Sequence, residues 1–224
     1  MYKKFLTFLA IVFSIAIIVM LSYLGYGLYE KYSKNHNAEQ FLDNEFEKYI
    51  EEDNKEDNKE DYSEVPEEQP TTNNQTKAYY NPYSYSESGV LYYYNHPVVG
   101  KISIPRTGIK YPILGDNNNA SAIEVAVLKI YGPEINEPGN VVIAGHNYNN
   151  GLFFGNNKKL QVGDKIYITD MTGRELEYTI YNKYYTPESD NSYFSRQTNG
   201  QTEITLYTCD ATGANRLIIF ARAE

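Results

Sequence analysis

The sequence has very few of the residues that carry most protein chemistry. Its 224 residues include one cysteine, Cys209, and three histidines. A single thiol cannot form an internal disulfide, so no disulfide framework holds this fold together. The sequence also lacks an HExxH motif, a paired-cysteine pattern and a glycine-rich phosphate loop, which excludes the common zinc and nucleotide-binding motifs. Any catalysis must therefore use a small number of side chains.

The folded part of the chain also lacks a strong net charge. The whole chain carries −9, but residues 35–77 alone hold 14 acidic and 4 basic side chains. Residues 79–224 hold 14 acidic and 12 basic side chains and are nearly neutral. Nucleic-acid binding through a basic surface is therefore not expected. A segment of this length is large enough for one domain with its own hydrophobic core.

Charge is missing altogether from one stretch near the N-terminus. No charged residue occurs in residues 5–28, and a helix of this length is about 36 Å long, enough to cross a hydrocarbon core. Two lysines precede it, as in a cleaved signal peptide. The apolar run is longer than an ordinary signal sequence, however, and no A-x-A cleavage site follows. We predict an uncleaved membrane anchor at residues 5–28. Two lysines before it are matched by Lys31 and Lys34 after it, so these charges leave its orientation open.

Residues 29–78 are predicted to form an acidic, flexible stalk. Their composition is dominated by Glu, Asp, Asn, Lys and Gln, and such a segment buries too little apolar surface to offset its ordering entropy. A short helix could form within it, since Phe41, Phe46 and Ile50 are among the apolar residues at helical spacing. Binding of cations or basic partners by the acidic run is a less favoured alternative.

Residues 79–97 form a tyrosine-rich arm, which holds seven of the 24 tyrosines of the chain. Tyrosine offers a large apolar face with a polar tip, so it suits both packing and binding surfaces. We expect an arm docked on the domain. A flap over a binding groove is the alternative.

Beyond residue 97 the hydrophobic pattern alternates as it does in β-strands. Eight short strands are predicted, separated by turns rich in Gly, Pro, Asn and Asp. Their ranges are 98–104, 109–113, 122–128, 140–144, 165–169, 176–184, 203–208 and 216–221. Short strands at this spacing are typical of a barrel. The predicted fold class is all-β, an eight-stranded barrel with one or two short helices, one of them near residues 153–160.

Three residues with reactive or charged side chains lie at predicted strand ends. Cys209 ends one strand, His146 follows another, and Arg216 begins the last. Taken singly, each has an ordinary explanation as a buried apolar thiol, a loop histidine or a surface arginine. A barrel can bring strand ends to one rim. There the three would supply a nucleophile, a proton shuttle and an oxyanion partner.

The sequence around these residues carries a recognisable pattern. Residues 205–209 read TLYTC and match the signature TLxTC, Gly145 and His146 match a catalytic histidine turn, and Arg216 begins the final strand. Together with the runs 99–105 and 138–146, these motifs resemble the sortases, the membrane-anchored cysteine transpeptidases of Gram-positive surfaces. The resemblance covers residues 98–224.

The resemblance implies an extracytoplasmic eight-stranded barrel on a single-pass anchor in the cell membrane, and no cofactor. Cys209 would attack the Thr carbonyl of the bond between Thr and Gly in an LPxTG-like sorting signal and form a thioacyl enzyme. His146 would protonate the departing amine, and Arg216 would hold the oxyanion. An amine of a cell-wall precursor or a pilin lysine would then accept the acyl group. The expected substrate contacts are Thr208, Leu206, Asn147 and Tyr207.

The motifs resemble more than one sortase subclass. Asn147 after the histidine resembles class B, whereas the short segment 185–202 is more like classes A or D. That segment should help to set the preferred sorting sequence. Loop acids, Glu134 and Glu137 with Glu188 or Asp190, resemble a calcium site, but ordinary exposed acids are the simpler interpretation and no metal is predicted.

Three alternatives to a wall-anchoring transpeptidase are retained. A cysteine peptidase would use the same residues but release the acyl group to water. A pilus-polymerising sortase would differ in its acceptor. A non-enzymatic wall-binding module would explain the stalk and the tyrosines, but it gives no reason for a thiol, an imidazole and a guanidinium to share one rim.

Overall fold

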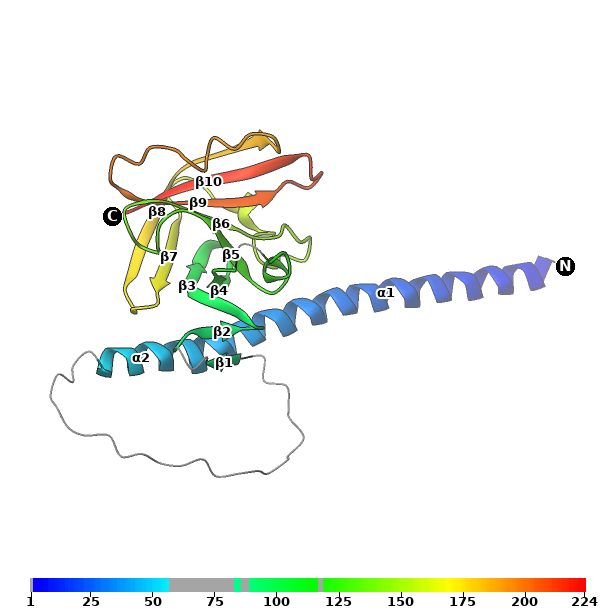
Figure 1. Ribbon diagram of the computed structural model, residues 1–224. Helices are drawn as coiled ribbons and strands as arrows, with labels where there is room; N and C mark the ends of the chain where they lie inside the picture. The colour runs from blue at the N-terminus through cyan, green and yellow to red at the C-terminus, as the bar shows by residue number, and fades with distance from the viewer. Residues whose placement is uncertain (1, 57–82, 86–88, 117–118) are drawn as a thin grey trace, which may run out of the picture.

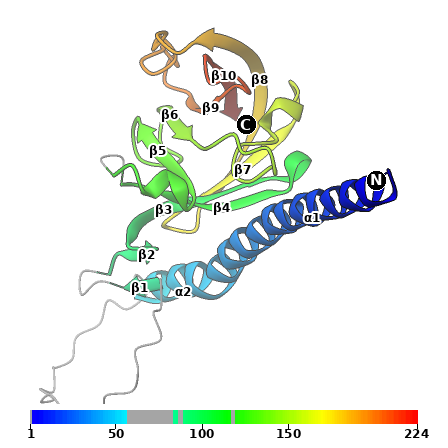
Figure 2. The ribbon, with the colours of Figure 1, turned by 90° about the vertical axis from the view of Figure 1, so that its right-hand side faces the viewer.

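The computed structural model describes residues 2–56, 83–85, 89–116 and 119–224. A long helix runs along one side of the molecule, and a β-barrel stands over its C-terminal half (Figure 1). The view turned by 90° shows the same arrangement, with β3 and β4 as the barrel strands nearest to the helix (Figure 2).

The described part of the chain contains ten strands in one continuous hydrogen-bonded sheet. They are β1 Tyr83–Tyr85, β2 Leu91–Tyr93, β3 His96–Ile104, β4 Ile109–Leu114, β5 Val127–Tyr131, β6 Gly139–Ala144, β7 Lys165–Asp170, β8 Glu175–Pro187, β9 Thr202–Cys209 and β10 Asn215–Ala223.

Strands β3 to β10 close into a barrel. Their order is β3-β4-β5-β6-β9-β10-β8-β7, and pairing of β7 with β3 completes the ring. The β4–β5 and β6–β9 pairs are parallel, and the other pairs in the ring are antiparallel. Each strand of the ring is paired on both sides, so the ring has no open edge. The predicted eight-stranded barrel is confirmed.

Two details of the predicted barrel differ from the structure. Residues 122–128 were expected to form one strand, but Ala122–Glu124 forms a 3-10 turn, η3, before β5 begins. A continuous apolar run does not distinguish a strand from a buried turn, and Ala122 is buried here as a packing residue. The helix expected near residues 153–160 is only a 3-10 turn, η4, Asn157–Lys159. A third 3-10 turn, η2, Pro105–Thr107, links β3 to β4.

The barrel interior is filled by side chains that alternate along the strands. Along β3, even-numbered residues are buried and odd-numbered residues are partly exposed. The interior residues form one cluster of mostly aliphatic side chains, among them Ile102, Ile143, Ile168, Leu206 and Ile219. This packed core fixes which residues of β9 and β10 point outward.

The N-terminal helix is much longer than the predicted anchor. It comprises α1 Tyr2–Phe41, a π-helical turn η1 Leu42–Phe46, and α2 Glu47–Glu56. The stalk prediction is therefore wrong for residues 29–56, while residues 57–78 lie outside the described residues. The short helix considered around residues 41–50 is present as part of this longer one.

Burial of apolar side chains explains why residues 29–56 fold despite their acidity. Phe41, Leu42 and Phe46 are completely buried, and they pack in a second cluster with side chains of β2 to β5 and η3. A π-helical turn is wider than an α-helical one, so it returns Phe46 to the face that already carries Phe41. Each buried Phe or Leu contributes about 1.5–3 kcal/mol.

Polar contacts align the helix with the barrel. Lys110 Nζ lies 2.8 Å from Asp43 Oδ1, and Lys101 Nζ lies 2.5 Å from Glu47 Oε1. Exposed ion pairs contribute at most about 1 kcal/mol each. Because these contributions are small, the burial of apolar side chains accounts for most of the stability of the docked helix.

The first part of α1 projects away from the barrel (Figure 1). Its apolar side chains between residues 5 and 28 are exposed, and the helix is long and apolar enough to cross a membrane by length and composition. At the other end, β1 and β2 form a small hairpin beside the helix, where Tyr93 packs on Phe41 with ring centroids 4.8 Å apart. Residues 79–82 and 86–88 of the predicted tyrosine-rich arm lie outside the described residues.

Candidate active site

Strand register places Cys209 directly opposite Arg216. The two are Cα partners in the antiparallel β9–β10 pair, and side chains opposite one another in such a pair lie on one face with Cβ atoms about 4.5–5.5 Å apart. Cys209 is half-buried. The predicted meeting of a thiol and a guanidinium at one strand end therefore follows from the hairpin itself.

The connection between these two residues is held by Asp210. Its backbone N–H donates to Asn215 O at 2.9 Å, and its carboxylate accepts from the Asn215 side chain at 2.9 Å and from Thr212 Oγ1 at 2.8 Å. The hydrogen bond from Asn215, with those from Thr212, outweighs desolvation and lowers the pKa of Asp210 to about 2. The charged carboxylate thus keeps the loop closed at neutral pH.

Gly145 joins the turn that carries His146 to the strand that carries Cys209. The parallel pairing of β6 with β9 continues past Ala144, because Gly145 N–H donates to Tyr207 O at 3.1 Å. The buried hydroxyl of Thr208 donates to Gly145 O at 2.6 Å. A Cβ at Gly145 would lie 2.8 Å from a ring carbon of Phe154, so this position needs glycine.

The imidazole of His146 contacts an acid that the sequence did not single out. Its Nε2 lies 2.9 Å from Oε1 of Glu124, the last residue of η3. Tyr148 donates its hydroxyl to the other carboxylate oxygen at 2.8 Å. Glu124 was hidden within the predicted strand 122–128, and nothing in its sequence context connected it to His146.

Arg216 is held from three directions and is almost fully buried. Its Nε donates to Tyr207 Oη at 2.8 Å, one terminal nitrogen donates to Gly213 O at 2.7 Å, and the other contacts the Glu188 carboxylate. Burial lowers the pKa of Arg216, but its hydrogen bond to Tyr207 raises it. Electrostatic attraction to Tyr207, Cys209 and Glu188 adds to this, and the net result is a raised pKa. The guanidinium remains charged beside the thiol.

The four expected substrate contacts differ in how far a substrate could reach them. Leu206 is 1% exposed in the barrel core, so it has no surface to offer a substrate. Thr208 is also largely buried and its hydroxyl holds Gly145, but it lines a small pocket together with Cys209. The assignment of Leu206 does not fit its burial, whereas Thr208 remains a candidate.

Asn147 and Tyr207 lie where a substrate could reach them. Asn147 lines a small pocket of about 60 Å³ together with Cys209, Asp210 and Tyr185. Tyr207 shares the outer face of β9 with Cys209, and its ring stacks on Tyr193 at 5.7 Å with an interplanar angle of 26°. Both remain candidates for substrate contacts.

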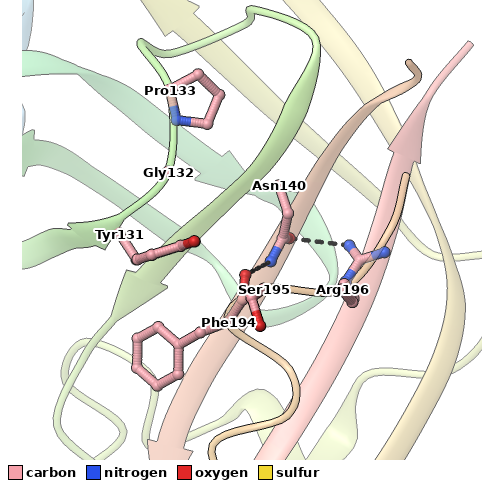
Figure 3. A pocket seen from close by; sticks show the side chains of 7 residues that line it. All are labelled: Tyr131, Gly132, Pro133, Asn140, Phe194, Ser195 and Arg196. Carbon is pink, nitrogen blue, oxygen red and sulfur yellow. Dashed lines mark hydrogen bonds between the residues drawn. The ribbon is translucent and has the colours of Figure 1, made fainter. Parts of the chain in front are cut away.

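A larger hollow lies farther along the outer face of the sheet. It has a volume of about 430 Å³ and is lined by Tyr131, Gly132, Pro133, Asn140, Phe194, Ser195 and Arg196. Figure 3 shows Asn140 of β6 beside the segment of residues 194–196: its amide donates to Phe194 O at 3.0 Å, and Arg196 donates to its Oδ1 at 2.9 Å. The sequence pointed to the 185–202 segment, but not to its partners on β5 and β6.

Three of the acids that resemble a calcium site contact basic side chains. Glu134 pairs with Lys129 at 3.3 Å, Glu137 pairs with Arg174 at 2.7 Å, and Glu188 contacts the site arginine. Among the residues that the structure describes, no group of three His, Cys, Asp or Glu side chains could hold a metal ion.

Residues 102–224 match the sortase domain. The chain belongs to the sortase family. It is 32% identical over 114 residues to sortase A of Bacillus anthracis, which covers 50% of this chain and 52% of that protein.

Solved sortase structures agree with this assignment. A Clostridium perfringens sortase D5 transpeptidase has 30% identity and a TM-score of 0.50, over 57% of this chain and 79% of its own. A lid mutant of Corynebacterium diphtheriae sortase A has 27% identity and a TM-score of 0.52, over 58% and 71%. The chain spans about half the length of the curated relatives it matches.

Proposed function

We propose that this sortase is a membrane-anchored cysteine transpeptidase that cleaves an LPxTG-like sorting signal between Thr and Gly and transfers the protein to an amine. The observation that carries the proposal is the hairpin register that sets Cys209 against a charged, buried Arg216. The hydrogen bonds that tie Gly145 to the strand of Cys209 support a position for His146 at the same end of the barrel.

The first half of the reaction forms a thioester. The Cys209 thiolate attacks the carbonyl carbon of the Thr residue, and the carbonyl oxygen becomes an oxyanion that Arg216 stabilises. The C–N bond then breaks, and His146 as imidazolium gives a proton to the leaving glycine amine. Arg216 would have to exchange part of its contact with Glu188 for this oxyanion, a substitution of one negative partner by another.

The second half transfers the acyl group. An incoming amine loses a proton to neutral His146 and attacks the thioester carbonyl, with the oxyanion again at Arg216. The C–S bond breaks, so the thiolate of Cys209 is restored and an amide is formed. The acceptor is an amine of a cell-wall precursor in this proposal. A pilin lysine would make the same enzyme a pilus polymerase, and water would make it a peptidase.

The sorting signal would lie along the outer face of β6 and β9. Val142, Tyr193 and Ile218 form a small apolar cluster on this face, and the hollow beyond it is bounded by Phe194 and Arg196. An extended peptide with its reactive carbonyl at Cys209 would run past Tyr207 toward this hollow. The segment 185–202 would then select the residues ahead of the cleaved bond.

The helix supports a single-pass arrangement with the barrel outside the cytoplasm. Residues 5–28 would span the membrane and residues 1–4 would be cytoplasmic. In place of a loose tether, residues 29–56 would hold the barrel close to the membrane as a docked helix, because their apolar face is buried against it. The catalytic barrel would comprise residues 98–224.

The experiment uses the full chain in detergent micelles, because removal of the docked helix would expose the apolar cluster beneath the barrel. The enzyme is incubated with an LPxTG-type peptide library, with and without oligoglycine or diaminopimelate amines. Cleavage that needs Cys209, with a product that changes when an amine is added, is expected. Cleavage that survives Cys209→Ala would overturn the proposal, and a product unaffected by any amine would identify a peptidase.

A further inference from the structure

Glu124 and Tyr148 surround the ring of His146 in a way that the assigned roles do not explain. His146 Nε2 lies 2.9 Å from Glu124 Oε1, and Tyr148 donates to Glu124 Oε2 at 2.8 Å. The rings of His146 and Tyr148 are 5.1 Å apart between centroids, at an angle of 48°. One carboxylate thus holds an imidazole and a phenol side by side.

Backbone hydrogen bonds fix the turn that carries Glu124, although its side chain lies at the surface. Glu124 ends the 3-10 turn η3, in which Glu124 N–H donates to Ser121 O and Val125 N–H donates to Ala122 O, both at 3.2 Å. The side chain of Ala122 is completely buried in the cluster beneath the barrel. The carboxylate is exposed, but the turn that carries it is anchored in the protein.

The docked helix also reaches this cluster. Lys34 of α1 donates to the backbone oxygen of Glu124 at 3.3 Å. The same ammonium lies 5.6 Å from the ring centroids of both Tyr148 and Phe153. A contact from a third element indicates that the position of Glu124 is set by the folded molecule as a whole.

The charge state of Glu124 determines what His146 must offer to it. The hydrogen bond from Tyr148, followed by contacts with His146 and Lys34, outweighs desolvation and lowers the pKa of Glu124. An ionised carboxylate only accepts hydrogen bonds. The Nε2 atom of His146 must therefore carry a proton in this contact, so that in the neutral ring Nδ1 is the nitrogen with a free lone pair.

We propose that Glu124 is a positioning residue that holds His146 in the Nε2–H tautomer, so that Nδ1 exchanges protons with the amines of the reaction. This inference rests on the transpeptidase function proposed above. Tyr148 orients the carboxylate, and Lys34 connects this arrangement to the helix that would enter the membrane. In other nucleophilic active sites, too, a third group orients the base that serves the nucleophile.

The competing interpretation is a resting-state latch. In that case Nε2 would be the working nitrogen and Glu124 would have to release it before each turnover. The two interpretations predict opposite effects of removing the carboxylate, because a positioning residue assists turnover and a latch inhibits it.

The test compares Glu124→Ala and Glu124→Gln with wild type in the full chain in detergent. Glu177→Ala is the matched control: Glu177 also accepts from a tyrosine, Tyr167, at 2.7 Å and pairs with a cation, Lys165, at 2.7 Å, but it lies on β8 away from His146. The readouts are the ¹⁵N shifts of the histidine rings at alkaline pH, assigned with His146→Gln, and kcat and KM for peptide cleavage.

In wild type, the neutral His146 ring is expected to show the Nε2–H pattern. Glu124→Ala should produce a tautomer mixture and lower kcat about tenfold with KM within about twofold, which is less than the 10²- to 10⁴-fold contribution of general acid–base catalysis because the imidazole remains. Glu124→Gln, which keeps an acceptor, should lie between the two. The control should match wild type.

Three results would overturn the inference: an unchanged tautomer in Glu124→Ala, an unchanged kcat, or a kcat that rises. Because the carboxylate is about half exposed, loss of folding is not expected, and Glu124→Gln provides a second variant of nearly equal volume. If wild type failed to cleave any sorting peptide, the proposed function would fail. The ring spectra would still show whether Glu124 sets the tautomer.

Discussion

Replacement of Thr208 by valine tests how the turn of His146 is tied to the strand of Cys209. Valine has nearly the same shape, so the substitution removes one hydroxyl and little else. That hydroxyl is buried and donates to Gly145 O at 2.6 Å. The substitution therefore leaves a buried carbonyl without this donor, one residue before His146.

The expected loss of stability follows from this geometry. A buried acceptor left without its donor costs about 1–3 kcal/mol. For a chain of this size, 1 kcal/mol shifts the melting temperature by about 2–4 °C. A loss of about 2 kcal/mol should therefore lower the melting temperature by about 4–8 °C. Displacement of a catalytic group by about 1 Å can cost about 10²-fold in rate, so we expect kcat to fall at least tenfold.

The assay measures melting temperature and kcat for three variants of the full chain. Thr205→Val is the matched control, since Thr205 is also buried on β9 but donates to Asn140 Oδ1 at 2.7 Å, away from the histidine turn. It should lose some stability and keep its kcat within about twofold. Thr208→Ser should restore most of the activity. Equal kcat values for Thr208→Val and Thr205→Val would refute the reasoning.

Three further predictions test other parts of the account. Arg216→Lys should lower kcat about 10²- to 10³-fold with an unchanged circular dichroism spectrum, since an ammonium cannot reproduce the planar fork; a near-normal rate would remove Arg216 from oxyanion binding. Phe46→Ala should lower the free energy of unfolding in a denaturant titration by about 3–5 kcal/mol, because its ring is completely buried; a change below about 1 kcal/mol would mean that the helix is not docked. Burial favours a raised pKa for Glu203, but hydrogen bonds from a tyrosine and two arginines lower it below its usual 4.5. Its contribution to stability is present above the unfolded pKa and is lost as the pH falls through the folded pKa, so Glu203→Gln should flatten the decline of melting temperature below about pH 4.5. An identical acid profile would contradict this.

The sequence predicted the barrel because its strands alternate clearly between apolar and polar residues. It misplaced residues 122–128, where a continuous apolar run conceals a 3-10 turn. It also misjudged residues 29–56. There the acidic composition led to the prediction of a flexible stalk. The apolar residues at helical spacing stabilise a helix because β2 to β5 supply an apolar surface for them to pack on.

The site was predictable to the extent that it depends on motifs and strand ends. Cys209, His146 and Arg216 were proposed in this way. The period of two along a strand would also have turned Leu206 away from the face of Cys209. Glu124 could not be found, because its contact with His146 depends on how a turn after β4 approaches a turn after β6.

The most direct test of the central claim is the intact mass of the full chain after brief incubation with an LPxTG-type peptide in the absence of an amine. The account predicts an adduct equal in mass to the acyl fragment that ends at Thr, located on Cys209, absent in Cys209→Ala and discharged by an added amine. Cleavage of the peptide by the Cys209→Ala chain would contradict the account, as would an adduct on any other residue.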